Sequence, residues 1–159
     1  MTPKPCEPLA AGQTAPDFTL SESLEKTVTL SELRGKPVVL AFYPADFSPV
    51  CGDQMALYNE VLPEFAKHDA TILGVSVDGV FCHKAYADSK NLHFSLLSDF
   101  EPKGAVSKAY GVYMDGIGIC GRALFVIDKN GVIAWSHNGS LDVNPGADGI
   151  LEALEGLPK

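Results

Sequence analysis

Two continuous apolar runs separated by a helical segment constrain the fold of this chain more than any other feature. PVVLAFY occupies residues 37–43 and TILGVSV occupies residues 71–77. Runs this rich in β-branched residues are typical of strands buried on both faces. Between them, apolar residues recur at helical spacing from Cys51 to His68. A buried strand, a helix and a second buried strand predict an α/β fold.

The rest of the chain continues this alternation of strands and helices. Short strands are expected in APDFTL, TVTL and FSLLSD, while RALFVID and VIAWSH flank KNG, the turn of a hairpin. Helices are expected in SELRGK, with Ser31 as N-cap and Gly35 as the stop, in VFCHKAYADSKN, ending near Asn91, in KGAVSKAYGV and in GADGILEALEGL. These elements predict a central mixed sheet flanked by helices.

The length of 159 residues suggests one domain. We place it at residues 13–159, after a flexible arm of residues 1–12 that is rich in Pro and Ala. This N-terminus lacks the apolar core of a signal peptide, and no apolar run is long enough to span a membrane, so we expect a cytoplasmic protein. The formal net charge of −8 argues against nucleic acid and anionic lipid surfaces as partners.

The four cysteines show no CxxC pairing. In a reducing compartment such cysteines are buried hydrophobes, metal ligands or reactive thiols, and seldom structural disulfides. Cys51 follows the stretch YPADFSPV, at the start of the helical segment. Reaction sites in open α/β sheets lie beyond the carboxyl ends of the strands, and a helix N-terminus favours a thiolate. Cys51 is therefore a candidate nucleophile, although its position also fits a small buried core residue.

Two residues beside Cys51 support the functional interpretation. Pro44 blocks continuation of the strand and can form a wall over the sulfur. Ser48 places a hydroxyl one helical turn before Cys51, where it can hydrogen-bond to a substrate or to the thiolate. Ser48 can equally be a plain N-cap, with Pro49 as the first helical residue, and both roles can hold at once.

Arg122 is the second candidate functional residue. The chain has only two arginines, and Arg34 lies in a turn expected at the surface. Arg122 opens a predicted core strand, where a charge must be paired if it is buried. A thiolate is a suitable partner for it.

These residues together resemble the peroxiredoxin family. Pro44, Ser48 and Cys51 match its Pro-x-x-x-(Thr/Ser)-x-x-Cys motif, and Arg122 matches the arginine before its FVID strand. LLSDFEPKGAVSKAYGV is most similar to the alkyl hydroperoxide reductase E subgroup, and next to the bacterioferritin-comigratory type. Ser48 replaces the commoner threonine. Gln54 stands where the family often has glutamate, which weakens an expected ionic contact.

The resemblance implies a thioredoxin-like fold and a thiol-dependent peroxidase that reduces hydrogen peroxide and organic hydroperoxides. Cys51 would attack the peroxide and become a sulfenic acid. Arg122 would favour the thiolate and bind the peroxide, and the N–H groups of Val50 and Cys51 could hold its oxygens. No cofactor and no metal is required. The reductant would be a thioredoxin-like protein or a low-molecular-weight thiol, and the family suggests a homodimer.

The thiol that resolves the sulfenic acid is less clearly indicated. The bacterioferritin-comigratory type often has it five residues after the first cysteine, where this chain has Ala56. Cys82 begins the helix after SVDG, in a region where some family members carry a resolving cysteine. We take Cys82 as the candidate, with an inert residue at a helix start as the alternative. His83 beside it suggests no metal site, because adjacent helical residues face different directions.

Three functions other than a peroxidase are compatible with parts of this sequence. A thiol–disulfide oxidoreductase on the same fold predicts a CxxC motif, and CGDQ at residues 51–54 lacks the second cysteine. A peroxide-sensing redox switch shares the first chemical step with a peroxidase, so the sequence does not separate the two. A cysteine hydrolase needs a histidine base, and no motif places one.

Overall fold

The structure is a computed structural model that describes residues 6–158. The strands of the main sheet are β1 Thr19–Ser21, β2 Thr27–Thr29, β3 Val38–Phe42, β4 Thr71–Ser76, β5 Ser95–Ser98, β8 Ala123–Ile127 and β9 Ile133–Asn138. The helices are η1 Leu30–Leu33, α1 Pro49–Glu60, α2 Leu62–Ala66, α3 Val80–Lys90, α4 Ala105–Ala109 and α5 Asp148–Glu155. A small separate hairpin, β6 Tyr113–Met114 and β7 Ile119–Cys120, was not predicted.

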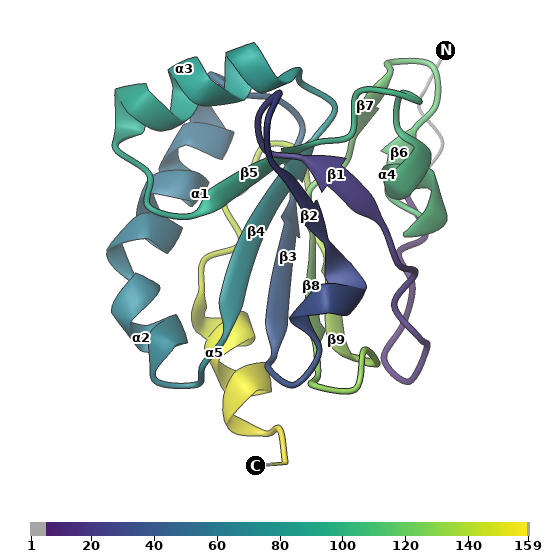
Figure 1. The fold of residues 1–159 in the computed structure, drawn as a ribbon, viewed down its shortest axis with the longest axis vertical. Helices are drawn as coiled ribbons and strands as arrows, with labels where there is room; N and C mark the ends of the chain where they lie inside the picture. The colour runs from purple at the N-terminus through teal and green to yellow at the C-terminus, as the bar shows by residue number, and fades with distance from the viewer. Residues whose placement is uncertain (1–5, 159) are drawn as a thin grey trace.

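The predicted mixed sheet is confirmed. Its seven strands run in the order β2-β1-β5-β4-β3-β8-β9. β3, β4 and β5 are parallel to one another, whereas β8 is antiparallel to β3 and the predicted β8–β9 hairpin closes one edge. In Figure 1 the helices α1, α2, α3 and α5 lie on one side of this sheet, and α4 lies on the other.

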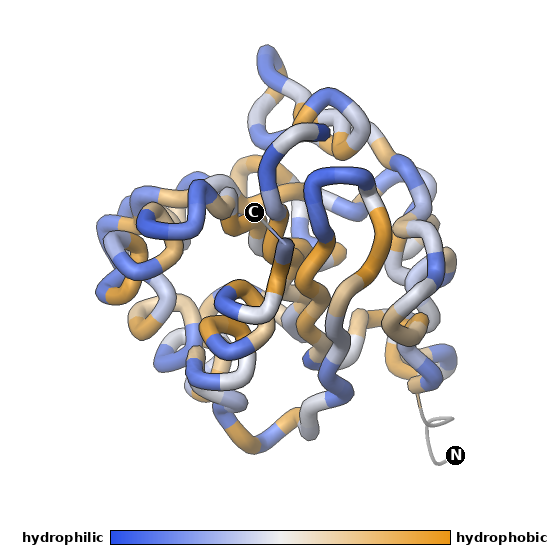
Figure 2. The backbone as a smooth tube through the Cα atoms, turned by 90° about the horizontal axis from the view of Figure 1, so that it is seen from below, coloured by the Kyte–Doolittle hydropathy of each residue, from blue (hydrophilic) through white to orange (hydrophobic). Residues whose placement is uncertain are grey.

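The alternation of side chains along the strands divides the core into two layers. Val38, Leu40 and Phe42 of β3 pack with the N-terminal segments and Tyr110 on one face. Val39 and Ala41 pack with α1, α2, α3 and α5 on the other. All five residues of β3 are buried, as the continuous apolar run predicts. The hydropathy of the backbone tube shows the same pattern, with hydrophobic strands inside and hydrophilic loops outside (Figure 2).

Two predicted helices differ in detail from the structure. SELRGK forms a 3-10 turn whose N-cap is Thr29, so Ser31 is not the cap; its N–H donates to Asp17 Oδ1 at 2.8 Å instead. The apolar pattern from Cys51 to His68 forms two helices that meet at Val61, because Pro63 in the first turn of α2 has no N–H to continue the ladder.

The N-terminal arm is only partly within the described residues, because residues 1–5 lie outside them. The Glu7 N–H donates to Gly111 O at 3.0 Å, and the Leu9 N–H donates to Tyr110 O at 3.1 Å. Residues 7–9 therefore run along the segment before β6. Within the described chain, the structure contains no helix with the length and apolar character needed to cross a membrane.

We predict that Phe125→Ala lowers the free energy of unfolding by about 3–5 kcal/mol, because it leaves a cavity in a close-packed core. Phe125 is 0% exposed and its ring lies against Phe42 and Tyr110. Leu24→Ala is the control, since that side chain is 77% exposed and its loss should leave stability unchanged. Urea unfolding monitored by circular dichroism measures both, and equal effects would contradict the two-layer core.

Candidate active site

Cys51 lies in the first turn of α1, directly after the loop that follows β3. Ser48 is the N-cap of this helix and Pro49 its first residue, as predicted. The Ser48 hydroxyl accepts a hydrogen bond from the Cys51 N–H at 3.4 Å, which leaves its own proton free to be donated elsewhere. Pro44 is buried at the start of the loop and Val50 is half-buried in the first helical turn.

Arg122 approaches Cys51 from the neighbouring strand. Ala123 of β8 is paired with Phe42, the last residue of β3, so Arg122 lies at the strand end from which the loop to α1 begins. Its Nη1 atom is 3.4 Å from the Cys51 sulfur. Arg122 is 1% exposed and Cys51 is 0% exposed, so the contact is screened from solvent. The structure therefore brings together two residues that the sequence separates widely.

The other partners of the Arg122 guanidinium are neutral. Nε donates to Ser140 O at 3.1 Å, Nη2 donates to Leu141 O at 2.8 Å, and Nη1 also donates to the amide oxygen of Gln54. Within residues 6–158 no carboxylate forms an ion pair with Arg122. A buried cation is unfavourable without a counter-charge. Of these hydrogen-bonding partners only Cys51 carries a group that can ionise to an anion.

Gln54 contacts Arg122 without neutralising its positive charge. It is fully buried, and its amide nitrogen donates to the Tyr58 hydroxyl at 3.0 Å, which donates in turn to Gly146 O at 3.1 Å. Burial raises the pKa of Tyr58 to about 12, so this hydroxyl remains a donor. A glutamate at position 54 would neutralise Arg122 directly. The amide instead orients the guanidinium and leaves its positive charge for the sulfur.

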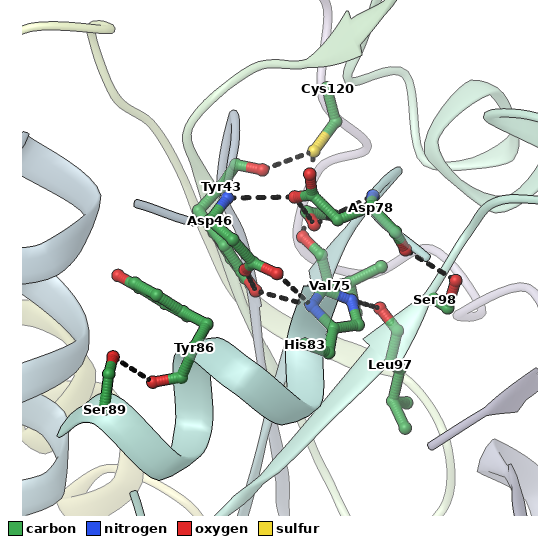
Figure 3. A network of polar contacts seen from close by, with 11 residues as sticks. Tyr43, Asp46, Val75, Asp78, His83, Tyr86, Ser89, Leu97, Ser98 and Cys120 are labelled. Carbon is green, nitrogen blue, oxygen red and sulfur yellow. Dashed lines mark hydrogen bonds and ion pairs between the residues drawn. The ribbon is translucent and has the colours of Figure 1, made fainter. Parts of the chain in front are cut away.

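A buried contact between Asp46 and His83 fixes the loop between β3 and α1, and it was not predicted from the sequence. The imidazole Nδ1 of His83, on α3, lies 2.7 Å from Asp46 Oδ2, and its Nε2 lies 3.0 Å from Leu97 O. Tyr43 donates its hydroxyl proton to Asp46 Oδ1 at 2.6 Å, and the Asp46 N–H donates to Asp78 Oδ2 at 2.9 Å. Figure 3 shows these contacts joining the loop to the start of α3.

The two ring nitrogens of His83 both face acceptors. Nδ1 lies against the Asp46 carboxylate and Nε2 against the Leu97 carbonyl, so the imidazole is held through both nitrogens. Asp46, Asp78 and His83 together place potential metal-ligand atoms within 4.8 Å of one another. Hydrogen bonds within the group already engage all three side chains. That the protein needs no metal stays a prediction.

Phe47 connects this loop to α3 on its outer side. Its φ of +66° is a left-handed conformation that costs an aromatic residue about 1 kcal/mol or more. The ring meets that of Tyr86 edge to face, with centroids 5.0 Å apart, while the Phe47 side chain stays 58% exposed. Backbone strain is thus held beside the candidate nucleophile by packing and by the Asp46–His83 pair.

The other thiols differ from Cys51 in their surroundings. Cys82 is half-buried in the first turn of α3, and burial together with the Asp46 carboxylate raises its pKa to about 11. Cys120 is completely buried, which raises its pKa, and its thiol donates to Tyr43 O at 2.9 Å. Cys6 donates to Val112 O at 3.5 Å. All four cysteines are free thiols.

A surface hollow lies away from these residues, at the other end of the sheet. It encloses about 740 Å³ near the amino ends of β3 and β4 and is lined by Pro37, Asp69 and Asp128 among others. Cys51 and Arg122 are not among its lining residues. The candidate active site is therefore separate from this hollow.

Comparison with known proteins decides the family. The sequence pattern described as "AhpC/TSA family" matches residues 11–136. The chain belongs to this family. Alkyl hydroperoxide reductase E of Mycobacterium tuberculosis is 43% identical over 130 residues, covering 81% of this chain and 85% of that protein. The chloroplastic peroxiredoxin Q of Sedum lineare is 40% identical over 147 residues, covering 92% of this chain and 78% of that protein.

Solved structures agree with the sequence matches. The peroxidoxin BcpB of Mycobacterium tuberculosis has a TM-score of 0.84 at 30% identity and covers 95% of this chain and 99% of its own. The reduced 2-Cys peroxiredoxin of Plasmodium vivax has a TM-score of 0.85 at 29% identity, and the match covers 93% of this chain and 81% of that one. The expected peroxiredoxin family, thioredoxin-like fold and thiol-dependent peroxidase class are thereby confirmed.

We predict that Asp46→Asn lowers the free energy of unfolding by about 3 kcal/mol, because it disrupts the buried Asp46–His83 pair and the hydrogen bond from Tyr43. Asp88→Asn is the matched control. It breaks the Lys84–Asp88 pair on the same helix, whose side chains are 75% and 68% exposed, and should leave stability unchanged. Urea titration compares the two variants, and equal midpoints would show that the buried pair does not fix the loop.

Proposed function

We propose that this peroxiredoxin reduces hydroperoxides by attack of the Cys51 thiolate on the O–O bond. The observation that carries the proposal is the buried Arg122 guanidinium, whose hydrogen-bonding partners include no other group that can ionise. The sulfur displaces alkoxide or hydroxide from the terminal peroxide oxygen. The S–O bond forms as the O–O bond breaks, the product is a sulfenic acid at Cys51, and the leaving oxygen takes a proton from water.

The neighbouring groups have distinct roles in this proposal. Arg122 stabilises the thiolate before attack and the charge on the leaving oxygen during attack. The Ser48 hydroxyl donates to the sulfur or to the peroxide, and the N–H groups of Val50 and Cys51 bind its oxygens at the positive end of α1. Pro44 shields the sulfur from water. No cofactor and no metal takes part.

The substrates are hydrogen peroxide and small organic hydroperoxides, because the sulfur of a fully buried Cys51 leaves little room for a large substituent. Electrons return from a thioredoxin-like protein or a low-molecular-weight thiol, as expected of a cytoplasmic enzyme. A homodimer is supported by three exposed phenylalanines, Phe47, Phe81 and Phe100, which follow β3, β4 and β5 at the same end of the sheet. Exposed apolar groups at one end of a molecule favour contact with a second copy.

Cys82 resolves the sulfenic acid in this proposal. Because β3 and β4 are parallel neighbours, α1 and α3 begin at the same edge of the sheet, and Cys51 and Cys82 both lie in first turns. With its pKa raised to about 11, Cys82 is almost entirely a thiol at neutral pH, and thiols are poor nucleophiles. Resolution therefore requires the start of α3 to unwind, which takes Cys82 away from Asp46 and toward Cys51.

We predict that Arg122→Lys lowers the second-order rate of Cys51 oxidation by about a hundredfold. Lysine keeps the charge but loses the planar fork that contacts sulfur and peroxide together. Stopped-flow mixing with hydrogen peroxide measures the rate, and Cys51→Ser gives the zero baseline. Arg34→Lys is the control, because Arg34 is exposed and donates to Asn130 O, far from the sulfur. An unchanged rate in Arg122→Lys would assign this arginine a structural role only.

We predict that peroxide-treated parent protein yields a peptide linked between Cys51 and Cys82. Cys82→Ser should instead accumulate sulfenic and then sulfinic acid at Cys51, because nothing removes the first oxidation product. Peptide mass spectrometry distinguishes these species. Cys120→Ser is the matched control and should still form the linked peptide. Free Cys82 in the oxidised parent protein would mean that an external thiol performs this step.

A further inference from the structure

The Tyr86 hydroxyl is a buried polar group without an assigned role. Tyr86 lies in the middle of α3 and is 0% exposed. Its oxygen has no hydrogen-bond partner among residues 6–158, and no other buried side-chain nitrogen or oxygen there is unpartnered. In Figure 3 the ring points away from the Asp46–His83 pair and no dashed line meets its hydroxyl. Buried hydroxyls are nearly always hydrogen-bonded, so an unpartnered one suggests a missing ligand.

The hydroxyl lies beside the first turn of α1. A Cβ placed on Gly52, the residue after Cys51, would be 3.8 Å from the Tyr86 oxygen. The same Cβ would be 3.1 Å from the Lys90 side chain, so the Tyr86 hydroxyl and the Lys90 ammonium both lie close to the residue that follows the nucleophile. The ring is held by two residues of the preceding loop, with the Tyr43 ring stacked at 6.5 Å and Phe47 edge-on at 5.0 Å.

The electrostatics of Tyr86 also connect it to the reacting sulfur. Burial is the largest cause of a raised Tyr86 pKa, followed by the charges at Cys51 and Asp46, while Arg122 acts in the opposite direction. The hydroxyl therefore keeps its proton throughout the neutral pH range. It can act as a hydrogen-bond donor to an oxygen bound at Cys51.

We propose that Tyr86 is a further catalytic residue, whose hydroxyl donates a hydrogen bond to the peroxide oxygen that is transferred to Cys51. This inference rests on the proposed peroxidase reaction. As the S–O bond forms and the O–O bond breaks, the transferred oxygen becomes the sulfenic hydroxyl, and the leaving alkoxide or hydroxide is protonated by water. Tyr86 gives up no proton in this step. Its hydrogen bond orients the terminal oxygen toward the sulfur, while Arg122 binds from the side of β8.

The variant Tyr86→Phe tests the role because it keeps the ring and removes only the oxygen. We expect the second-order rate of Cys51 oxidation by hydrogen peroxide to fall at least about tenfold, as one positioned donor is lost. We expect the rate of Cys51 alkylation by iodoacetamide to change less than about twofold, because this reagent brings no peroxide oxygen to the site. We also expect the unfolding midpoint to stay the same or to rise, since an unpartnered buried hydroxyl is removed.

Tyr110→Phe is the matched control. Tyr110 is equally buried, but it belongs to the other core layer and its hydroxyl donates to Pro16 O at 2.6 Å. This variant should lose stability and keep the parent rate with peroxide. Tyr86→Phe should show the opposite pattern, with a slower reaction and no loss of stability. The comparison therefore separates a catalytic role from a packing role.

Two outcomes would overturn the assignment. A parent-like peroxide rate in Tyr86→Phe would show that the hydroxyl does not contact the substrate, and an equal fall in the peroxide and alkylation rates would show that Tyr86 only packs against the site. The parent protein and Cys51→Ser are measured in parallel. If the parent protein is itself unreactive toward peroxide, the proposed function fails, which is a different result from failure of the Tyr86 inference.

Discussion

The burial of one guanidinium without a carboxylate organises the active end of this protein. Arg122 is 1% exposed, and its hydrogen bonds go to two carbonyls, one amide and the Cys51 sulfur. The neutral partners fix the position of the cation but do not cancel its charge. A buried charge without a counter-charge is costly, so the position of Arg122 depends on these hydrogen bonds. Gln54 contributes by accepting from Arg122 while carrying no charge of its own.

Helix α3 presents three functional groups. His83 points into the loop before α1, and Tyr86, one helical turn later, lies beside Gly52 in α1. Cys82, adjacent to His83, lies near the Asp46 carboxylate as well. In the proposed reaction, peroxide attack uses α3 folded, with the loop and Tyr86 in place, whereas a disulfide to Cys82 requires the start of α3 to unwind. The two proposed half-reactions thus use different states of the same helix, and breaking the Asp46–His83 pair lies between them.

The sequence was sufficient for the fold class and for the residues nearest the sulfur. Continuous apolar runs identified β3 and β4, and the Pro44, Ser48 and Cys51 spacing, together with the motif position of Arg122, identified the site. The break between α1 and α2 was not predicted, because the helical spacing of apolar residues continues past Pro63. The Asp46–His83 pair could not be predicted, because it depends on how a loop and a helix 37 residues apart meet at one edge of the sheet. The isolation of the Tyr86 hydroxyl likewise becomes visible only in the packed core.

The carbonyls that hold Arg122 come from Ser140 and Leu141, in the last part of the chain. Cys51 is made early during synthesis, but the guanidinium and the groups that orient it are made much later. A ribosome-bound or partly unfolded chain therefore has an ordinary cysteine at position 51, without the cation that activates it. In the proposed reaction, sensitivity to oxidation is therefore acquired only when the fold is complete.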